Sequence, residues 1–340
     1  MAATHRHSAP HASNRWATKA LAHLEMTRPY TMFHSGLVAI AGYELAAQGQ
    51  TVVWRVVLAA LVTMCGWEAG LYAGDYYDRD IDARGKPLRP VPSGRVSARE
   101  AFLTMVGLIV AGCLCALALG VGNLVLAILT TVCGIAYSKT FKSRAILGNF
   151  DRGVLGVCAV LFGALAGGDI ARPAVLLLAA LVFFHDAATN LVGAVRDVDG
   201  DRDASCTTVP VVYGVARSVD IAAMLALCWV VIGCALFAII QRGPLDLVLY
   251  AWALGLAGSV YIPLWRKRTQ ITRPRALTAH KYLVVERLVL MCAFIAAYAP
   301  AAVALGLLAV TLAASIGSQI LLRDRHERQV LVASGKKTCT

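Results

Sequence analysis

Charged side chains are scarce in this 340-residue sequence: only 15% of the residues are charged, whereas 58% are hydrophobic. So low a charged fraction excludes an ordinary water-soluble globular domain. The sequence also lacks a CxxC pair and any Cys/His spacing typical of a metal site, and most of its ten cysteines lie within apolar stretches. The first 29 residues lack the features of a cleavable secretory signal, so we expect the first apolar segment to act as an uncleaved membrane signal.

Apolar stretches of membrane-spanning length recur from about residue 30 to residue 322. They predict an all-α fold, a polytopic membrane helical bundle with nine core transmembrane helices, a tenth helix and cytoplasmic cap loops. The expected spans are residues 30–48, 52–74, 101–120, 122–138, 149–168, 173–195, 219–240, 244–265, 283–299 and 301–322. Pro300 marks either a tight turn between the last two or a kink in one long helix.

Basic residues are concentrated in alternate connections and in both tails of the chain, which has a net charge of +12. By the positive-inside rule, both termini lie in the cytoplasm of a protein integral to the cytoplasmic membrane. We expect a disordered tail over residues 1–27, a membrane domain over 28–300, an extra helix over 301–322 and a second tail over 323–340. The charge indicates topology and attraction to anionic membrane lipid, with no nucleic acid partner. The basic connection 266–281 is predicted to lie along the membrane surface, with contact to a soluble partner as the alternative.

Two clusters of aspartates follow apolar segments: Asp75, Asp78, Asp80 and Asp82 in the first, and Asp197, Asp199, Asp201 and Asp203 in the second. On a helix, Asp75, Asp78 and Asp82 share one face, as do Asp197 and Asp201, whereas Asp80 and Asp199 point elsewhere. Carboxylates this close repel one another unless a cation holds them. Hard oxygen ligands without Cys or His suit Mg²⁺ that bridges to phosphate, although two solvated acidic loops remain the alternative.

Each acidic face continues into the membrane. Glu68 lies seven residues before Asp75, and Asp186 and Asn190 lie on the stripe that leads to Asp197. Ionisable residues at such depth are costly and by default functional. The alternative is a pair of protonated carboxyl groups that hydrogen-bond between helices, and His185, which points off the stripe, is predicted to be a packing residue.

Basic side chains follow the acidic clusters closely. Lys86, Arg89 and Arg95 lie in a proline-stiffened segment, where they can reach phosphate oxygens from one side. Tyr137 and Lys142 end the fourth span and offer a phenol and an ammonium at the same membrane face. Positive-inside topology explains part of this pattern, but it does not explain the interleaved acids.

The motifs resemble those of a known family. Residues 74–82, GDYYDRDID, look like the NDxxDxxxD motif of the UbiA superfamily of intramembrane prenyltransferases, and residues 89–95, RPVPSGR, match its usual continuation. Residues 197–201, DVDGD, are similar to the family's DxxxD motif. Gly74 replaces the usual Asn of the first motif and so removes a polar side chain next to the expected metal, and a tenth helix exceeds the family's nine.

The resemblance implies a helical bundle around a lipid-facing cavity in which Mg²⁺ activates an isoprenyl diphosphate. By resemblance, Asp75, Asp78, Asp82, Asp197 and Asp201 would coordinate the metal, and Lys86, Arg89, Arg95 and Lys142 would face the diphosphate. We include Tyr137 and Asn190 in the predicted diphosphate-binding set.

Three functions fit these residues. The leading prediction is prenyl transfer to a small aromatic or lipid-like acceptor, with an aromatic one favoured and with Glu68 or Asp186 orienting the acceptor or taking up its proton. An intramembrane terpene cyclase, which needs no acceptor, is the alternative. A cation transporter is the third, disfavoured because the acids cluster at one face. The prenyl chain length, the acceptor and the oligomeric state are left open.

Overall fold

The computed structural model describes residues 12–240 and 243–323, and within them it has no strand longer than one isolated bridge. The α-helices are α1 (Ala12–Thr27), α2 (Pro29–Ala47), α3 (Val53–Tyr77), α4 (Arg79–Gly85), α5 (Ala98–Leu119), α6 (Val121–Ala136), α7 (Ala145–Gly167), α8 (Pro173–Asp203), α9 (Val209–Tyr213), α10 (Val215–Ile239), α11 (Pro244–Arg266), α12 (Arg273–Ala296) and α13 (Ala301–Ser318). Short π-helices, η1 (Tyr137–Phe141) and η3 (Gln319–Arg323), extend α6 and α13, and a 3₁₀ turn, η2 (Arg268–Gln270), follows α11. The predicted all-α class is confirmed.

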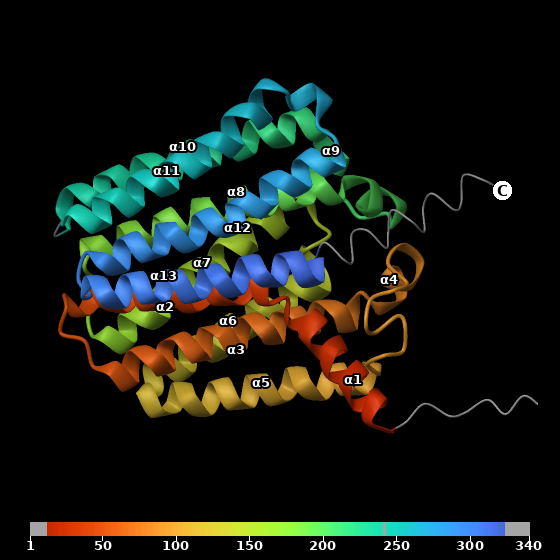
Figure 1. Ribbon diagram of the computed structural model, residues 1–340, viewed down its shortest axis with the longest axis horizontal. Coiled ribbons are helices and arrows are strands. Elements are labelled where there is room, and N and C mark those ends of the chain that lie inside the picture. Colours follow the sequence, from red (N-terminus) through yellow and green to blue (C-terminus); the bar gives the residue numbers. More distant parts are fainter. Residues whose placement is uncertain (1–11, 241–242, 324–340) are drawn as a thin grey trace, which may run out of the picture.

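The long helices run side by side along one axis of the molecule (Figure 1). Eight helices of the described part are long and apolar enough to span a membrane, with α2 and α12 not among them. Those two helices carry more polar residues and lie in the interior, where α2 packs against α7 and α3, and α12 against α11 and α2. Every predicted span coincides with one of these ten helices, although whether all ten cross the bilayer stays a prediction.

The chain reverses tightly at Pro300. Helix α12 ends at Ala296, the backbone N–H groups of Tyr298 and Ala299 bond the carbonyl of Ile295, and α13 begins at Ala301 and packs back against α12. Of the two interpretations of Pro300, the tight turn is therefore confirmed. Proline suits this place because it caps α13, where its missing N–H removes no helical hydrogen bond.

Glycines allow α2 and α7 to lie very close together. A Cβ atom added to Gly163 would stand 1.9 Å from the carbonyl oxygen of Ala39, and one added to Gly42 would stand 2.3 Å from that of Val160. Such small residues let helix backbones meet inside a membrane, where packing rather than hydrophobicity joins helices. This contact fixes the position of α2. Residues of α2, among them His34 and Val38, line a large cavity in the bundle.

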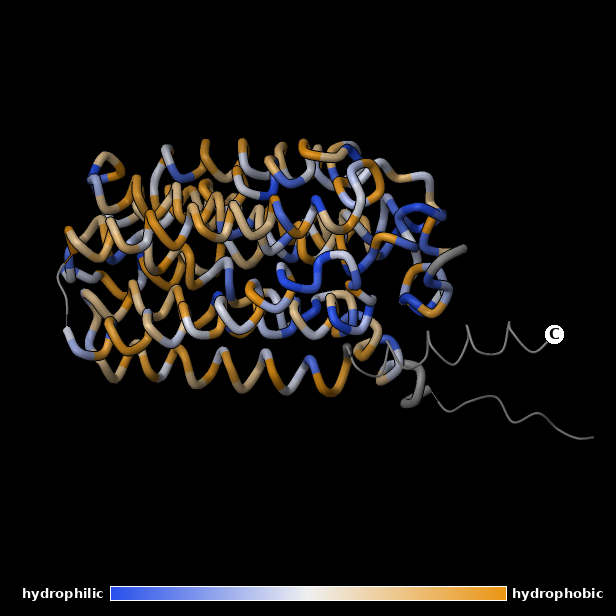
Figure 2. Tube along the Cα trace, turned by 90° about the horizontal axis from the view of Figure 1, so that it is seen from above, coloured by the Kyte–Doolittle hydropathy of each residue, from blue (hydrophilic) through white to orange (hydrophobic). Residues whose placement is uncertain are grey.

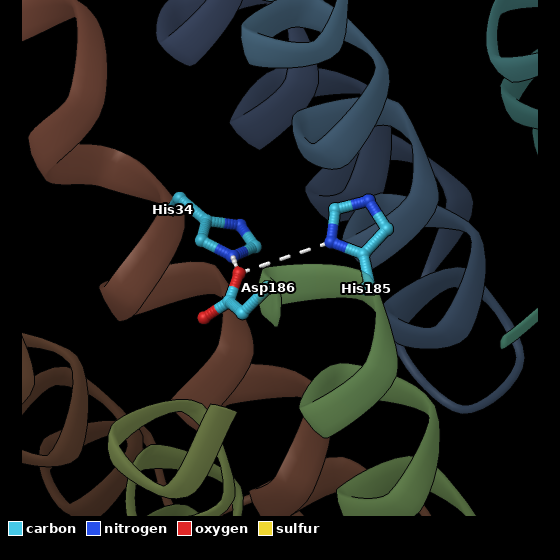
Figure 3. Close-up of side chains that lie close together, drawn as sticks. All are labelled: His34, His185 and Asp186. Atoms are coloured by element: carbon cyan, nitrogen blue, oxygen red, sulfur yellow. Dashed lines mark hydrogen bonds and ion pairs between the residues drawn. The ribbon is translucent and has the colours of Figure 1, made fainter. Parts of the chain in front are cut away.

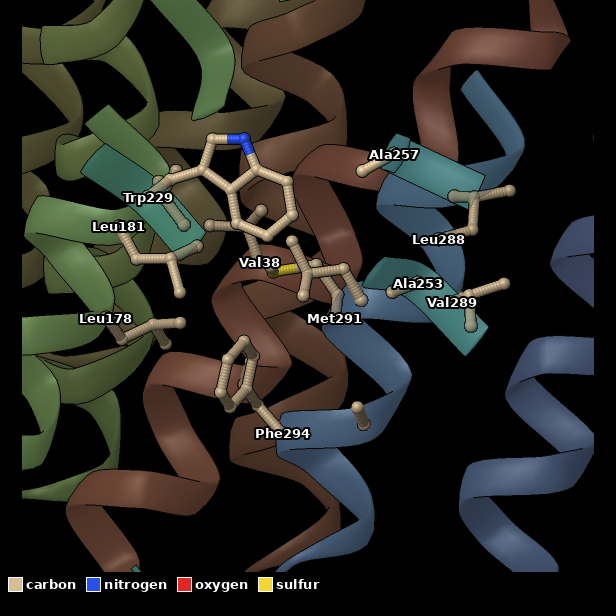
Figure 4. Close-up of a cluster of buried hydrophobic side chains, with 14 of the residues drawn as sticks. Val38, Leu178, Leu181, Trp229, Ala253, Ala257, Leu288, Val289, Met291 and Phe294 are labelled. Atoms are coloured by element: carbon tan, nitrogen blue, oxygen red, sulfur yellow. The ribbon is translucent and has the colours of Figure 1, made fainter. Parts of the chain in front are cut away.

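Large apolar side chains fill the space among α2, α8, α10, α11 and α12 (Figure 4). Trp229 of α10 is fully buried there beside Leu181 of α8 and Met291 of α12. The outer faces of α5, α6 and α10 expose Leu114, Leu129 and Leu227 instead. Apolar residues on both the inner and the outer faces are expected of helices that contact lipid.

Hydrophilic segments gather at one end of the bundle (Figure 2), the end that carries α4 and α9 in Figure 1. Helix α1 lies at this end too, so the expectation of a disordered segment is wrong for residues 12–27. Ala22 and Met26 of α1 are buried, and His23 hydrogen-bonds the hydroxyl of Tyr72 at 2.8 Å. An amphipathic helix without a long apolar run gives no hydropathy signal, which explains the error. The remaining tail residues, 1–11 and 324–340, lie outside the described part of the chain.

The predicted surface connection 266–281 is also largely helical. Helix α12 starts at Arg273, nearly three turns before the expected span, so only the short segment around η2 joins it to α11. Arg273 and His280 line the central cavity. The basic residues of this region therefore belong in part to the cavity wall.

Candidate active site

The first aspartate cluster lies where α3 gives way to α4. Asp75 is in the last turn of α3, Asp78 ends that helix, and Asp82 lies in α4. The helix that was expected to carry all three is therefore interrupted at Asp78, but the backbone bonds from Asp78 to Gly74 and from Asp82 to Asp78 keep the helical spacing. Asp75 and Asp82 still face the same way, because Arg89 approaches both of them.

Basic residues neutralise this cluster. The guanidinium of Arg89 lies 2.5 Å from Asp82 and 3.6 Å from Asp75, and Arg28 donates to Asp75 at 2.5 Å. Lys142, from the loop after η1, pairs with Asp78. Although burial acts to lower it, the pKa of Lys142 is held above the ordinary lysine value by the Asp78 carboxylate. We refer to Asp75, Asp78 and Asp82 as the first acidic array.

The second acidic array, Asp197 and Asp201, lies in the last two turns of α8. Arg196 donates to Asp197 at 2.5 Å, and the Thr208 hydroxyl donates to Asp201 at 3.0 Å. The side chain of Asp199 is 78% exposed, whereas that of Asp197 is 30% exposed, as the predicted helical facing requires. The α8 helix thus runs unbroken from the membrane interior to the acidic array.

Lys86 connects the two arrays electrostatically. Burial and the nearby Arg89 guanidinium lower the pKa of Lys86, and the attractions of Asp197 and Asp82 oppose that shift only in part. The Lys86 ammonium is thus within electrostatic reach of both arrays. Both arrays, with Lys86, Arg89 and Lys142, line one cavity of about 1810 Å³.

The other predicted site residues differ in their positions. Tyr137 and Asn190 line the cavity and hydrogen-bond each other at 3.4 Å. Arg95 also lines it, but its guanidinium is held by Glu25 of α1 at 2.6 Å. Glu68 is buried and does not line the cavity, and neither of its carboxylate oxygens has a hydrogen-bond partner among the described residues. Contact between Glu68 and a substrate in the cavity is therefore not supported.

The acidic arrays fit Mg²⁺. Their five carboxylates are hard oxygen donors that line one cavity, and in each array a basic side chain pairs with a carboxylate. Mg²⁺ prefers such donors together with phosphate oxygens. A Cβ atom added at Gly74 meets nothing within 4 Å, so the Asn expected from the motif would also fit there.

A second polar cluster lies deeper in the membrane. Asp186 of α8 accepts from His34 of α2 at 3.2 Å and lies 3.8 Å from His185 (Figure 3). His185 also bonds Glu286 at 2.8 Å, and Arg152 lies 3.5 Å from Asp186. The prediction that His185 is only a packing residue is wrong, because it joins a buried hydrogen-bond network. His, His and Asp could hold a metal ion, but the neighbouring arginine already compensates the carboxylate.

Sequence reasoning did not single out His34, Arg152, Glu286 and Arg287. Arg152, Glu286 and Arg287 do lie inside the predicted spans 149–168 and 283–299. A charged residue within an apolar span is itself a functional signal. The search for stripes behind the aspartates missed them because they come from helices without an acidic cluster.

An apolar helical bundle with two acidic arrays that line one cavity is the arrangement of an integral membrane enzyme. Residues 35–284 match the model of the UbiA prenyltransferase family, and the chain belongs to this family. It is an intramembrane prenyltransferase.

Relatives with assigned names extend over most of the domain. The digeranylgeranylglyceryl phosphate synthase of Natronomonas pharaonis is 33% identical over 240 residues, which cover 70% of this chain and 80% of the relative. The enzyme of that name from Thermococcus kodakarensis is 30% identical over 210 residues, covering 62% and 75%. A UbiA homologue from Archaeoglobus fulgidus, solved with GPP and Mg²⁺, has the same fold, with a TM-score of 0.65, 19% identity and coverage of 81% of this chain and 99% of the other.

Proposed function

We propose that this protein transfers a prenyl group from an isoprenyl diphosphate to a hydroxyl group of a glyceryl phosphate acceptor, with Mg²⁺ as cofactor and release of diphosphate. The observation that carries the proposal is that both acidic arrays, together with Lys86, line one cavity. The name shared by the two relatives denotes a glyceryl phosphate that carries two geranylgeranyl groups. It supports a glyceryl phosphate acceptor in place of the small aromatic acceptor expected from the sequence.

The five carboxylates of the two arrays would hold the metal. When bound, Mg²⁺ supplies positive charge to the phosphate oxygens of the donor and makes the diphosphate a better leaving group. Arg89 and Lys142 are at present paired with Asp82 and Asp78. If a bound cation neutralises those carboxylates instead, Arg89 and Lys142 become available to the diphosphate and stabilise the negative charge that develops on it.

The rest of the cavity suits the prenyl chain. Below the acidic mouth it is lined by apolar side chains, among them Val38, Ala159 and Phe162. Such walls contact the prenyl chain and exclude water, which would otherwise attack the reacting carbon and convert the prenyl group to its alcohol. The cavity thus joins a charged mouth to an apolar interior, as an amphiphilic diphosphate requires.

A hydroxyl acceptor loses one proton during the transfer. Asp186 and His34 line the cavity below the arrays, and they hydrogen-bond each other at 3.2 Å. We assign proton uptake to this pair, with the carboxylate of Asp186 held in place by His185 and Arg152. Glu68, which was the other predicted candidate, is not among the residues that line the cavity.

The orientation in the membrane is part of the proposal. The described chain begins with α1 and ends with η3 at the same end of the bundle as α4 (Figure 1). Basic residues are abundant at this end, which includes Lys86, Arg89 and Lys142. The positive-inside rule then places the cavity mouth and both ends in the cytoplasm.

Product analysis tests the function. The purified protein is incubated with Mg²⁺ and isoprenyl diphosphates of several lengths, each with a geranylgeranylglyceryl phosphate acceptor, with 4-hydroxybenzoate or with no acceptor. We expect a prenylated glyceryl phosphate and equimolar diphosphate. A prenylated aromatic acid would overturn the acceptor assignment, and a cyclic hydrocarbon formed without acceptor would identify a terpene cyclase.

A further inference from the structure

Two arginines line the cavity well below its acidic mouth. Arg152 comes from α7 and Arg287 from α12, and both approach the indole of Trp67 on α3. Their Cζ atoms lie 4.3 Å and 6.0 Å from the centre of that ring. The indole is itself held by a hydrogen bond from its Nε1 to the Thr31 hydroxyl at 3.1 Å. Three helices and a fixed aromatic ring thus place two guanidinium groups at one level of the cavity wall.

This level is distinct from the diphosphate site. Trp67 precedes Asp75 by eight residues on the same helix, which corresponds to about 12 Å along the helix axis. Arginine at such depth in an apolar span is costly, and its presence indicates a function. The mechanism proposed for the donor diphosphate uses Lys86, Arg89 and Lys142, whereas Arg152 has so far been assigned only the positioning of Asp186 and Arg287 has no assigned role.

The hydrogen-bonding capacity of Arg152 is largely unused. Asp186 lies 3.5 Å from its guanidinium, and Asp151, its neighbour in the chain, also attracts it, but no hydrogen bond joins Arg152 to a described residue. Asp186 meanwhile shares its charge with His34 and His185. The side chain of Arg152 is 13% exposed, and that exposed part faces the cavity. Guanidinium N–H groups are therefore available to a ligand that enters from the cavity.

The charge at this level favours an anion. Arg152, Arg287 and Asp186 line the cavity, whereas the carboxylates of Asp151 and Glu286 are buried and do not line it, and Glu286 pairs with His185. Two planar guanidinium groups match the oxygens of a phosphate monoester, which they bind through paired, charge-assisted hydrogen bonds. Stacking on an indole also keeps a guanidinium oriented while its edge stays available.

We propose that Arg152, assisted by Arg287 and positioned by Trp67, binds the phosphate group of the acceptor. This inference rests on the proposed function and adds to it the site that selects the acceptor class. The phosphate would lie below the donor diphosphate, so that the acceptor hydroxyl falls in the gap between the two levels, near Asp186 and His34. A carbocation that cyclised without an acceptor would be repelled by the same two positive charges, which disfavours the cyclase.

The test compares Arg152→Gln with the wild-type protein in steady-state kinetics. The acceptors are geranylgeranylglyceryl phosphate and the same lipid without its phosphate. For Arg152→Gln we expect KM for the phosphorylated acceptor to rise about 10-fold or more, as for loss of a charged hydrogen bond. The KM for the isoprenyl diphosphate should stay within about twofold, and the preference for the phosphorylated acceptor should disappear.

Two further variants serve as controls for the effect of Arg152→Gln. Arg152→Lys, which keeps the charge but loses the planar fork, should show an intermediate KM for the acceptor. Arg268→Gln, which removes an arginine paired with Asp220 at 3.0 Å, should behave as the wild type. Mg²⁺-dependent binding of the donor to Arg152→Gln shows that this variant is folded. If this variant does not fold, the wild-type protein is used instead. The subsite is then supported if the wild type prefers the phosphorylated acceptor and if inorganic phosphate inhibits by competing with the acceptor but not with the donor.

The outcomes separate the inference from the proposed function. Three results would overturn the phosphate subsite while leaving prenyl transfer intact. They are an unchanged acceptor KM in Arg152→Gln, equal increases in the KM values of acceptor and donor, and a wild-type enzyme that uses the dephosphorylated lipid equally well. Wild-type protein that prenylates no glyceryl acceptor would overturn the proposed function, and the subsite with it.

Discussion

The Nη1 atom of Arg89 lies 2.5 Å from the Oδ2 atom of Asp82. This ion pair shows how a basic side chain compensates the charge of the first acidic array. The same guanidinium reaches Asp75 at 3.6 Å, so one arginine bridges the two ends of the first acidic array. Metal and diphosphate must therefore replace existing ion pairs when they bind.

Removal of Mg²⁺ should abolish activity but leave the bundle folded. Because Arg28, Arg89 and Lys142 already balance the first acidic array, chelation does not expose it to uncompensated repulsion. Mg²⁺ alone should raise the thermal unfolding midpoint only slightly. Mg²⁺ with a diphosphate analogue at 100 times its Kd should stabilise the protein by about 2.7 kcal/mol. Unfolding on chelation, followed by circular dichroism, would count against this balance of charges.

Binding of the donor should weaken at alkaline pH because of Lys86. Burial and Arg89 lower the pKa of Lys86, so its positive charge is lost at a lower pH than that of an ordinary lysine. The Kd of an isoprenyl diphosphate analogue should therefore rise as the pH increases through this lowered pKa. In Lys86→Arg the rise should move to higher pH, since a guanidinium stays protonated. The same alkaline profile in both proteins would assign the titration to another group.

Replacing Asp186 should separate binding from transfer. Asp186→Asn keeps the size of the side chain but removes the charge that pairs with His34 and His185. We expect the rate of prenyl transfer to fall by about 100-fold or more, the usual effect of losing a general base. Binding of the donor with Mg²⁺ should be unaffected, because the acidic arrays are intact. Full activity in Asp186→Asn would refute its role in proton uptake.

Close packing of α2 on α7 should be sensitive to a single methyl group. In Gly163→Ala the new Cβ atom would stand 1.9 Å from the Ala39 carbonyl oxygen, so the two backbones must separate. We expect destabilisation of about 1–3 kcal/mol, seen as a lower unfolding midpoint in detergent. Gly107→Ala is the matched control, because nothing lies within 4 Å of that position. Equal stability of the two variants would contradict the described helix contact.

The parts of the site that could be predicted from the sequence are those set by helical spacing. Asp197 and Asp201 share a face of α8 while Asp199 is exposed, because consecutive turns of one helix need no knowledge of the remaining fold. The contacts that join segments far apart could not be predicted in this way. Arg28 on Asp75 and Lys142 on Asp78 depend on how α2, α3 and η1 pack, and a spacing within one helix carries no such information.

The same limit applies inside the membrane. Asp186 was singled out because it lies on the stripe of α8, but its partner His34 lies on α2, 152 residues away. Glu68 occupies the equivalent position on α3, yet the packing of that helix turns it away from the cavity. A stripe therefore predicts direction relative to one helix axis, while access to the cavity depends on neighbouring helices.

The central claim is that the two acidic arrays form one metal-dependent diphosphate site. Its most direct test is the binding of a non-hydrolysable isoprenyl thiodiphosphate with and without Mg²⁺ to the wild type, Asp82→Asn, Asp197→Asn and the exposed control Asp199→Asn. The account predicts that Mg²⁺ tightens binding in the wild type and in the control. It predicts that Asp82→Asn and Asp197→Asn each lose about 10-fold or more of that effect. Undiminished Mg²⁺-dependent binding in either variant would show that its array is not part of the site.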